Sequence, residues 1–245
     1  MTKKEKKPTQ FVVETLPWKS KKCPKEIPVP LPQPGKVCWT LLAKRQSGKT
    51  LLLCNLVRAY RRHMDLIVIL SPTLHLDQKW KSVSHFDNVI GSDTVNNETL
   101  TRIVQAQRES YDPEHPGEYQ CLLIVDDAGN DFRRASLRQM MNVLYCTFRH
   151  YGGNLICAVQ SLQHMESTQI SNTSQWCIWD TNQRSLKKIA TDLATSRINE
   201  KDLEEFIKNN TRELYSFVFI DYTAPPEETF RIGFDRIYTK IEQGG

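Results

Sequence analysis

The chain has 245 residues, of which 39% are hydrophobic and 25% charged, so it is long enough to bury a core and has a globular composition. Its 33 lysines and arginines exceed its 28 aspartates and glutamates by five, which argues against a uniformly basic DNA-coating protein. No apolar run approaches the roughly 18 residues that a membrane-spanning helix needs, and residues 11–13 are too short an apolar stretch for a secretory signal.

Residues 1–36 are expected to form a basic, proline-rich leader in front of one domain over residues 37–245. The leader holds nine lysines against three glutamates, a net charge of +6, so the rest of the chain carries −1. Two interpretations of this charge stay open: a tail that touches polyanions, and a solvated tail or nuclear-import signal. Prolines at 28, 30, 32 and 34 predict an extended, semi-rigid connector.

From residue 37 the chain alternates between apolar strand-like runs and helical patterns. Strands are predicted at 37–42, 66–70, 121–125, 154–159 and 176–179. Helices are predicted over 52–60, 98–108, 137–148, 186–193 and 203–207. Two late strands, 214–220 and 229–234, are expected to form a hairpin or edge addition. Apolar strands that alternate with helices predict an α/β fold with a mostly parallel central sheet covered on both faces.

The seven cysteines include no C-x-x-C pair, which favours a reducing compartment over a disulfide scaffold or a four-cysteine zinc site. Cys38, Cys121, Cys157 and Cys177 fall within strand-like apolar segments. We expect these four to be small buried hydrophobic residues rather than reactive groups.

The segment between the first strand and the first helix has the pattern of a phosphate-binding P-loop. Its backbone N–H groups, at the start of a helix, suit the triphosphate of ATP. Gly48 permits close approach, Lys49 is expected to reach the β- and γ-phosphates, and the Thr50 hydroxyl to bind Mg²⁺. The predicted nucleotide-binding residues are Ala43, Lys44, Arg45, Gln46, Ser47, Gly48, Lys49 and Thr50. Because Ala43 replaces the usual first glycine, either the loop enters at negative φ or its shape is altered.

Two acidic residues end the strand at 121–125. Asp126 is expected to hold Mg²⁺ opposite Thr50, and Asp127 to orient or deprotonate the attacking water. The alternative is an aspartate pair that caps a turn.

Gln160 and Arg149 flank the strand at 154–159. Gln160 is either a sensor of the γ-phosphate or an ordinary turn residue. Arg149 is either an arginine finger for a neighbouring subunit or a cation at a helix end. Other candidates for the finger are Arg133, Arg134, Arg184 and Arg197.

These motifs, in this order and spacing, resemble the FtsK/HerA superfamily over about residues 37–180. The residues concerned are 44–50, 122–127, Arg149-His150 and 156–161. The similarity is closest to the genome-packaging ATPases of large nucleo-cytoplasmic DNA viruses, poxviruses and virophages. Departures are Ala43 and Asp127, where many relatives carry glycine and glutamate.

The resemblance implies a RecA-like P-loop NTPase fold of the additional-strand type, in which the Gln160 strand lies between the Asp126 strand and the P-loop strand. It implies an ATP- and Mg²⁺-dependent motor, assembled as a pentamer or hexamer ring, that pumps double-stranded DNA into a preformed capsid. A capsid or portal-vertex partner is then expected. So are a location in the viral factory of the host-cell cytoplasm and an association with the virion.

Two other functions compatible with a P-loop are a helicase-like nucleic-acid remodeller and a small-molecule kinase. A nucleotide-switched scaffold is disfavoured by the second acid, since hydrolysis requires an activated water. For a motor, basic residues at Arg184, Lys187 and Lys188 on one helix side could contact DNA phosphates, although the residues alone favour a solvated helix face.

Overall fold

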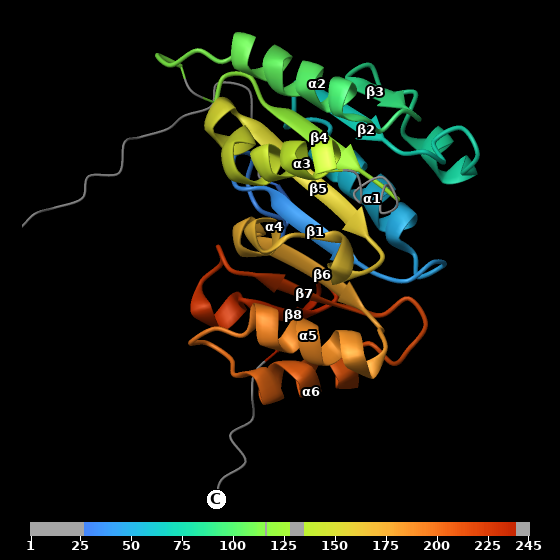
Figure 1. Cartoon of the computed structure of the whole chain (residues 1–245), viewed down its shortest axis with the longest axis vertical. Helices are drawn as coiled ribbons and strands as arrows, with labels where there is room; N and C mark the ends of the chain where they lie inside the picture. Colours follow the sequence, from blue (N-terminus) through green and yellow to red (C-terminus); the bar gives the residue numbers. More distant parts are fainter. Residues whose placement is uncertain (1–26, 116, 128–134, 239–245) are drawn as a thin grey trace, which may run out of the picture.

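The computed structural model describes residues 27–115, 117–127 and 135–238 (Figure 1). Within them, a nine-stranded sheet has the order β3-β2-β4-β5-β1-β6-β7-β8-β9. The strands are β1 (Cys38–Leu42), β2 (Leu66–Leu70), β3 (Val89–Ser92), β4 (Cys121–Val125), β5 (Gly153–Val159), β6 (Gln175–Trp179), β7 (Phe217–Asp221), β8 (Phe230–Ile232) and β9 (Arg236–Ile237).

The sheet is parallel from β3 to β6 and antiparallel beyond it. Strand β1 pairs with β5 on one side and β6 on the other, both parallel. Strand β7 runs antiparallel to β6, and β8 antiparallel to β7. The predicted mostly parallel sheet with a late antiparallel hairpin is therefore confirmed, as is the position of β5 between β4 and β1.

Helices cover both faces of the sheet. They are α1 (Lys49–Tyr60), α2 (Asn97–Glu109), α3 (Ala135–Thr147), α4 (Ser167–Asn172), α5 (Gln183–Leu193) and α6 (Glu200–Asn210). Figure 1 shows α3 and α5 in front of the sheet and α1 behind it. The core residues of α2, α3, α5 and α6 belong to one cluster, and those of α1 to the other.

Alternating side chains along each strand supply the two core layers. In β4, Leu123 and Val125 face the α3 side, whereas Leu122 and Ile124 face α1. All five residues of β4 are at most 1% exposed. Because both faces are buried, the strand is apolar throughout instead of alternating with polar residues.

The connector before β1 differs from the prediction. Residues 27–36 contain two turns, closed by the Leu31 N–H to Pro28 O and Lys36 N–H to Gln33 O hydrogen bonds, rather than one extended segment. Ile27 is buried in the α1-side core at 3% exposure. The Tyr60 hydroxyl donates to Pro32 O at 2.8 Å. These contacts fix the chain on the domain before β1 begins.

The four cysteines predicted to lie in strands do so, and none of the cysteines in the described residues forms a disulfide. Burial raises the pKa of Cys38, Cys121 and Cys157 to about 12, as expected for thiols that act as packed hydrophobic groups. The basic leader up to residue 26 lies outside the described residues. Among the described helices, none has the length and apolar character needed to cross a bilayer.

Candidate nucleotide-binding site

The turn between β1 and α1 has the backbone shape of an anion-binding loop. Gln46 (φ 62°) and Gly48 (φ 95°) adopt left-handed conformations on either side of Ser47. Gly48 is the N-cap of α1, and no side chain caps the helix there. The first N–H groups of α1 therefore remain available to an anion, and the helix dipole favours negative charge at this point.

Ala43 fits the loop without backbone strain. It is not among the described residues with positive φ, so the loop enters at negative φ, the first of the two alternatives above. Its N–H donates to Val159 O of the neighbouring strand at 3.1 Å. Its carbonyl accepts a hydrogen bond from Lys49 Nζ, also at 3.1 Å. The alanine thus continues the β1 pairing and helps to hold the lysine.

Lys49 is a buried cation within the loop. Lys49 is only 7% exposed. Burial lowers its pKa, and the nearby carboxylates of Asp126 and Asp127 act in the opposite direction. A desolvated ammonium with one carbonyl partner has spare capacity to bind an anion.

The residues from the two distant motifs meet at the carboxyl edge of the sheet. Thr50 Oγ1 donates to Asp126 Oδ2 at 3.3 Å. Asp126 is 1% exposed, and its other oxygen, Oδ1, is buried without a hydrogen-bond partner in the described residues. Burial raises the pKa of Asp126 to about 6, although Lys49 lowers it. A threonine hydroxyl beside an unpaired buried carboxylate oxygen is the donor set that a magnesium ion with bound water requires.

Asp127 and Gln160 form a pair at the ends of neighbouring strands. Gln160 Nε2 donates to Asp127 Oδ1 across the carboxyl ends of β5 and β4. Asp127 has a left-handed backbone (φ 56°), which turns the chain out of the strand, and its side chain lines the cleft. Gln160 therefore contacts a residue that lines the cleft but does not line the cleft itself.

A cleft of about 890 Å³ contains the P-loop and the acidic residues. Beyond the predicted residues it is lined by Leu51, Leu52 and Asn55 of α1 and by two further groups. On the acidic side these are Thr73, Leu76, Asp77 and Lys79, from the segment after β2. On the opposite side are Trp179, Tyr215 and Phe217. The volume suits a nucleoside triphosphate.

Arg149 lies at the amino ends of the parallel strands, opposite the carboxyl ends where the cleft is. It belongs to the 3₁₀ helix η3 (Phe148–Tyr151), which precedes β5, whereas Gln160 follows β5. The seven residues of β5 separate the two by roughly 20 Å. The Arg149 side chain is exposed and forms no hydrogen bond or ion pair within the described residues, whereas its carbonyl oxygen accepts from the Gly152 N–H at 3.2 Å. It cannot reach the cleft of its own chain.

The other arginine candidates have different surroundings. Arg197 Nη1 donates to Thr229 Oγ1 at 2.6 Å, which ties it to the β8 side of the domain. Arg184 is exposed in the first turn of α5. Arg133 and Arg134 lie outside the described residues. The basic side of α5 faces solvent, and Lys188 pairs with Asp192 at 2.9 Å.

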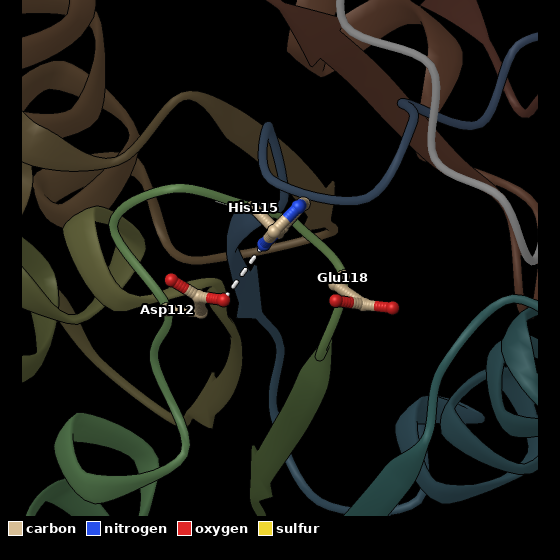
Figure 2. A group of neighbouring side chains, drawn as sticks. All are labelled: Asp112, His115 and Glu118. Atoms are coloured by element: carbon tan, nitrogen blue, oxygen red, sulfur yellow. Dashed lines mark hydrogen bonds and ion pairs between the residues drawn. The ribbon is translucent and has the colours of Figure 1, made fainter.

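A second group of potential metal ligands lies away from the cleft. Ligand atoms of Asp112, His115 and Glu118 are within 4.8 Å of one another (Figure 2). All three residues are exposed and precede β4, at the edge opposite the cleft. Asp112 accepts from the Glu114 N–H at 2.8 Å and lies 2.8 Å from His115 Nδ1; the bond to His115 lowers the pKa of Asp112. These contacts describe a capped surface turn.

Comparison with known proteins finds one matching family and several solved structures with a similar fold. The model of the poxvirus A32 protein family matches residues 36–235. The genome-packaging NTPase B204 of Sulfolobus turreted icosahedral virus 2, in complex with AMP, superposes with a TM-score of 0.58 at 16% identity, covering 83% of this chain and 99% of that one. A search of curated proteins finds no match.

Two more solved structures share the fold. The DNA-packaging ATPase B204 of Sulfolobus turreted icosahedral virus gives a TM-score of 0.57 at 15% identity, covering 78% of this chain and 94% of that one. The cytoplasmic domain of the type VII secretion ATPase EccC of Thermomonospora curvata gives 0.56 at 11% identity, covering 84% of this chain and 24% of that one. At such identities the structural likeness establishes the fold, here that of P-loop ATPases.

Proposed function

The chain belongs to the poxvirus A32 protein family, and from this premise we propose that it is an ATP-hydrolysing motor that packages double-stranded viral DNA into a preformed capsid. The observation that carries the ATPase assignment is the Thr50–Asp126 contact inside the P-loop cleft. It joins residues 76 positions apart in the sequence around one unpaired carboxylate oxygen. The similarity in fold to B204, solved with AMP and described as a genome-packaging NTPase, supports the same assignment.

Binding of ATP follows from the loop geometry. The free N–H groups at the start of α1 and the Lys49 ammonium are proposed to hold the β- and γ-phosphates. Thr50 and Asp126 would hold Mg²⁺, which, when bound, neutralises phosphate charge. Negative phosphates near Lys49 favour its protonated form, opposing the effect of burial on its pKa.

Activation of water is proposed for Asp127. Gln160 fixes one oxygen of this carboxylate, so the side chain is oriented before substrate arrives. Asp127 would accept a hydrogen bond from the attacking water, and Gln160 would act as a positioning residue that couples the γ-phosphate to Asp127.

Completion of the site is proposed to need a neighbouring subunit. Because Arg149 is exposed at the far edge of the sheet, it is suited to reach the γ-phosphate of another copy. We propose a ring of five or six subunits around double-stranded DNA, with a capsid or portal-vertex protein as docking partner. Its place of action would be the viral factory in the host-cell cytoplasm, with association with the virion during packaging.

The test is ATP turnover by the purified full chain as a function of double-stranded DNA length. We expect DNA to stimulate turnover, and Lys49→Ala and Asp127→Asn to reduce it at least about 100-fold. Wild-type turnover that ignores DNA, in the presence of the viral capsid vertex, would contradict the motor assignment. Strand separation without packaging would favour the helicase-like alternative, and phosphate transfer to a metabolite would favour the kinase.

A further inference from the structure

The sheet order divides the cleft into two ends. The acidic residues follow β4 and β5, on one side of the P-loop strand β1, whereas β6 and β7 lie on the other side. In the proposed function, the γ-phosphate and its cation occupy the end with Thr50 and Asp126. The rest of the nucleotide must then extend toward β6 and β7, because the P-loop holds the phosphates between the two ends.

Three aromatic side chains line that second end. Trp179 ends β6, Phe217 begins β7, and their ring centroids are 4.9 Å apart. Trp179 is only 4% exposed, so this pair forms a packed apolar wall. Tyr215 also lines the cleft and is 62% exposed. An apolar, aromatic end beside a phosphate-binding loop suits a nucleobase.

Tyr215 is held against the P-loop. A Cβ placed on Gly48 would lie 3.4 Å from Cδ1 of the tyrosine ring. The loop that carries the ring is closed by two bonds to Glu213 O, from the Ser216 N–H at 3.1 Å and the Ser216 hydroxyl at 2.6 Å. The ring therefore has a defined place at the mouth of the cleft although most of it is in contact with solvent.

The backbone of Tyr215 supports a functional reason for this position. Its φ of 66° is in the left-handed region, which costs a non-glycine residue about 1–2 kcal/mol. Its neighbour Leu214 is also exposed, at 78%, but does not line the cleft. An exposed aromatic ring on a strained backbone next to the P-loop lacks a packing explanation and fits a role in ligand binding.

We infer that Tyr215 stacks on the base of a purine nucleoside triphosphate, with Trp179 and Phe217 as the wall behind it. The inference rests on the proposed function, since it requires the phosphates to bind at the P-loop. Stacking depends on the size of the π face rather than on base-specific hydrogen bonds. The site should therefore accept ATP and GTP and bind CTP more weakly.

The test compares two ligands that share the triphosphate and differ in the base. Dissociation constants of MgATP and of inorganic tripolyphosphate are measured for the full chain and for Tyr215→Ala, Tyr215→Phe, Leu214→Ala and Lys49→Ala. We expect Tyr215→Ala to weaken ATP binding about tenfold, in the range measured for base stacking on aromatic residues, and to leave tripolyphosphate binding unchanged. Tyr215→Phe and Leu214→Ala should bind both ligands like the wild type.

The outcomes separate this inference from the proposed function. Unchanged ATP binding by Tyr215→Ala would overturn the stacking role. Equal weakening of ATP and tripolyphosphate would also overturn it, because it would show a structural effect on the loop. Lys49→Ala should lose both ligands; if it retains them, the P-loop assignment itself fails. A raised KM with little change in kcat for Tyr215→Ala supports stacking, since the base binds equally in the ground and transition states.

Discussion

Asp126 is a buried carboxylate whose charge costs stability when no ligand is bound. Burial raises its pKa to about 6 from 3.8, so folding disfavours the ionised form that predominates at pH 7. We expect Asp126→Asn to raise the free energy of unfolding at pH 7 by roughly 1–3 kcal/mol and to reduce ATP turnover at least about 100-fold. Urea unfolding without nucleotide and a turnover assay measure the two effects.

The sign of the pH dependence provides the control. The folded state binds more protons at Asp126 than the unfolded state between about pH 4 and pH 6, so the contribution of this group to stability falls as pH rises through that interval. The difference between wild type and Asp126→Asn should therefore shrink on acidification toward pH 4. A difference that grows on acidification would contradict the assigned shift.

The strand cysteines predict a second pH effect, at alkaline pH. Burial raises the pKa of Cys121 and Cys157 to about 12 from 9.0, so the unfolded chain loses these protons first as pH rises. Their contribution is present below pH 9 and is lost above it, at about 1.4 kcal/mol per thiol by pH 10. Denaturant unfolding at pH 8 and pH 10 of wild type and Cys157→Ala measures this, and an equal pH dependence in both would contradict it.

At the scale of elements, Gly152 ends one structure and opens the next. It caps η3 with φ 75°, directly before β5. A Cβ at this position would lie 2.5 Å from the backbone oxygen of Tyr119. We expect Gly152→Ala to lower the free energy of unfolding by about 2–4 kcal/mol, because left-handed strain adds to a clash with backbone. Chemical denaturation measures the loss.

Gly35 offers the matched control for that substitution. Its φ is 82°, yet an added Cβ would meet no atom within 4 Å. Gly35→Ala should therefore cost only the strain, about 1–2 kcal/mol. Equal losses of unfolding free energy at the two positions would show that the clash with the Tyr119 backbone oxygen does not contribute to the cost of Gly152→Ala.

The strands that sequence predicted best are those buried on both faces. The bounds of β2 and β4 agree with the predicted 66–70 and 121–125, because continuous apolar runs mark central parallel strands. Strand β3 (Val89–Ser92) was missed: it is an edge strand, Ile90 is 54% exposed, and Gly91 interrupts the pattern. The six-residue α4 was also missed, being too short to show a helical period.

Some residues of the candidate site could likewise be predicted from sequence, and others could not. The P-loop could be predicted because strand, loop and helix follow one another locally, and Asp126 because two acids directly follow an apolar strand. The position of β5 came from family resemblance, since strand order has no local signature. Tyr215 and Asp77 lie in irregular segments, and only the folded sheet brings them to the cleft. No periodic signal in the sequence could have identified them.

At the scale of the whole molecule, the cleft and the proposed arginine finger lie at opposite ends of the parallel strands. The P-loop cleft is at the carboxyl end of β1, and Arg149 precedes β5 at the other edge. One subunit can supply a cleft to one neighbour and an arginine to another, which is the head-to-tail contact that the proposed ring requires. The rate of ATP hydrolysis would then depend on contact between neighbouring subunits.

This arrangement predicts that two inactive variants restore activity to each other. Arg149→Ala should bind ATP and turn it over poorly, whereas Lys49→Ala should fail to bind nucleotide but keeps its arginine. In rings mixed in equal amounts, an intact cleft meets an intact arginine at about one interface in four, so turnover should recover to about a quarter of wild type if interfaces act independently. Size-exclusion chromatography of differently tagged variants verifies that mixed rings form. Mixed rings without any recovery would place the arginine finger elsewhere, because a finger acting across the interface must restore those sites where both partners are intact.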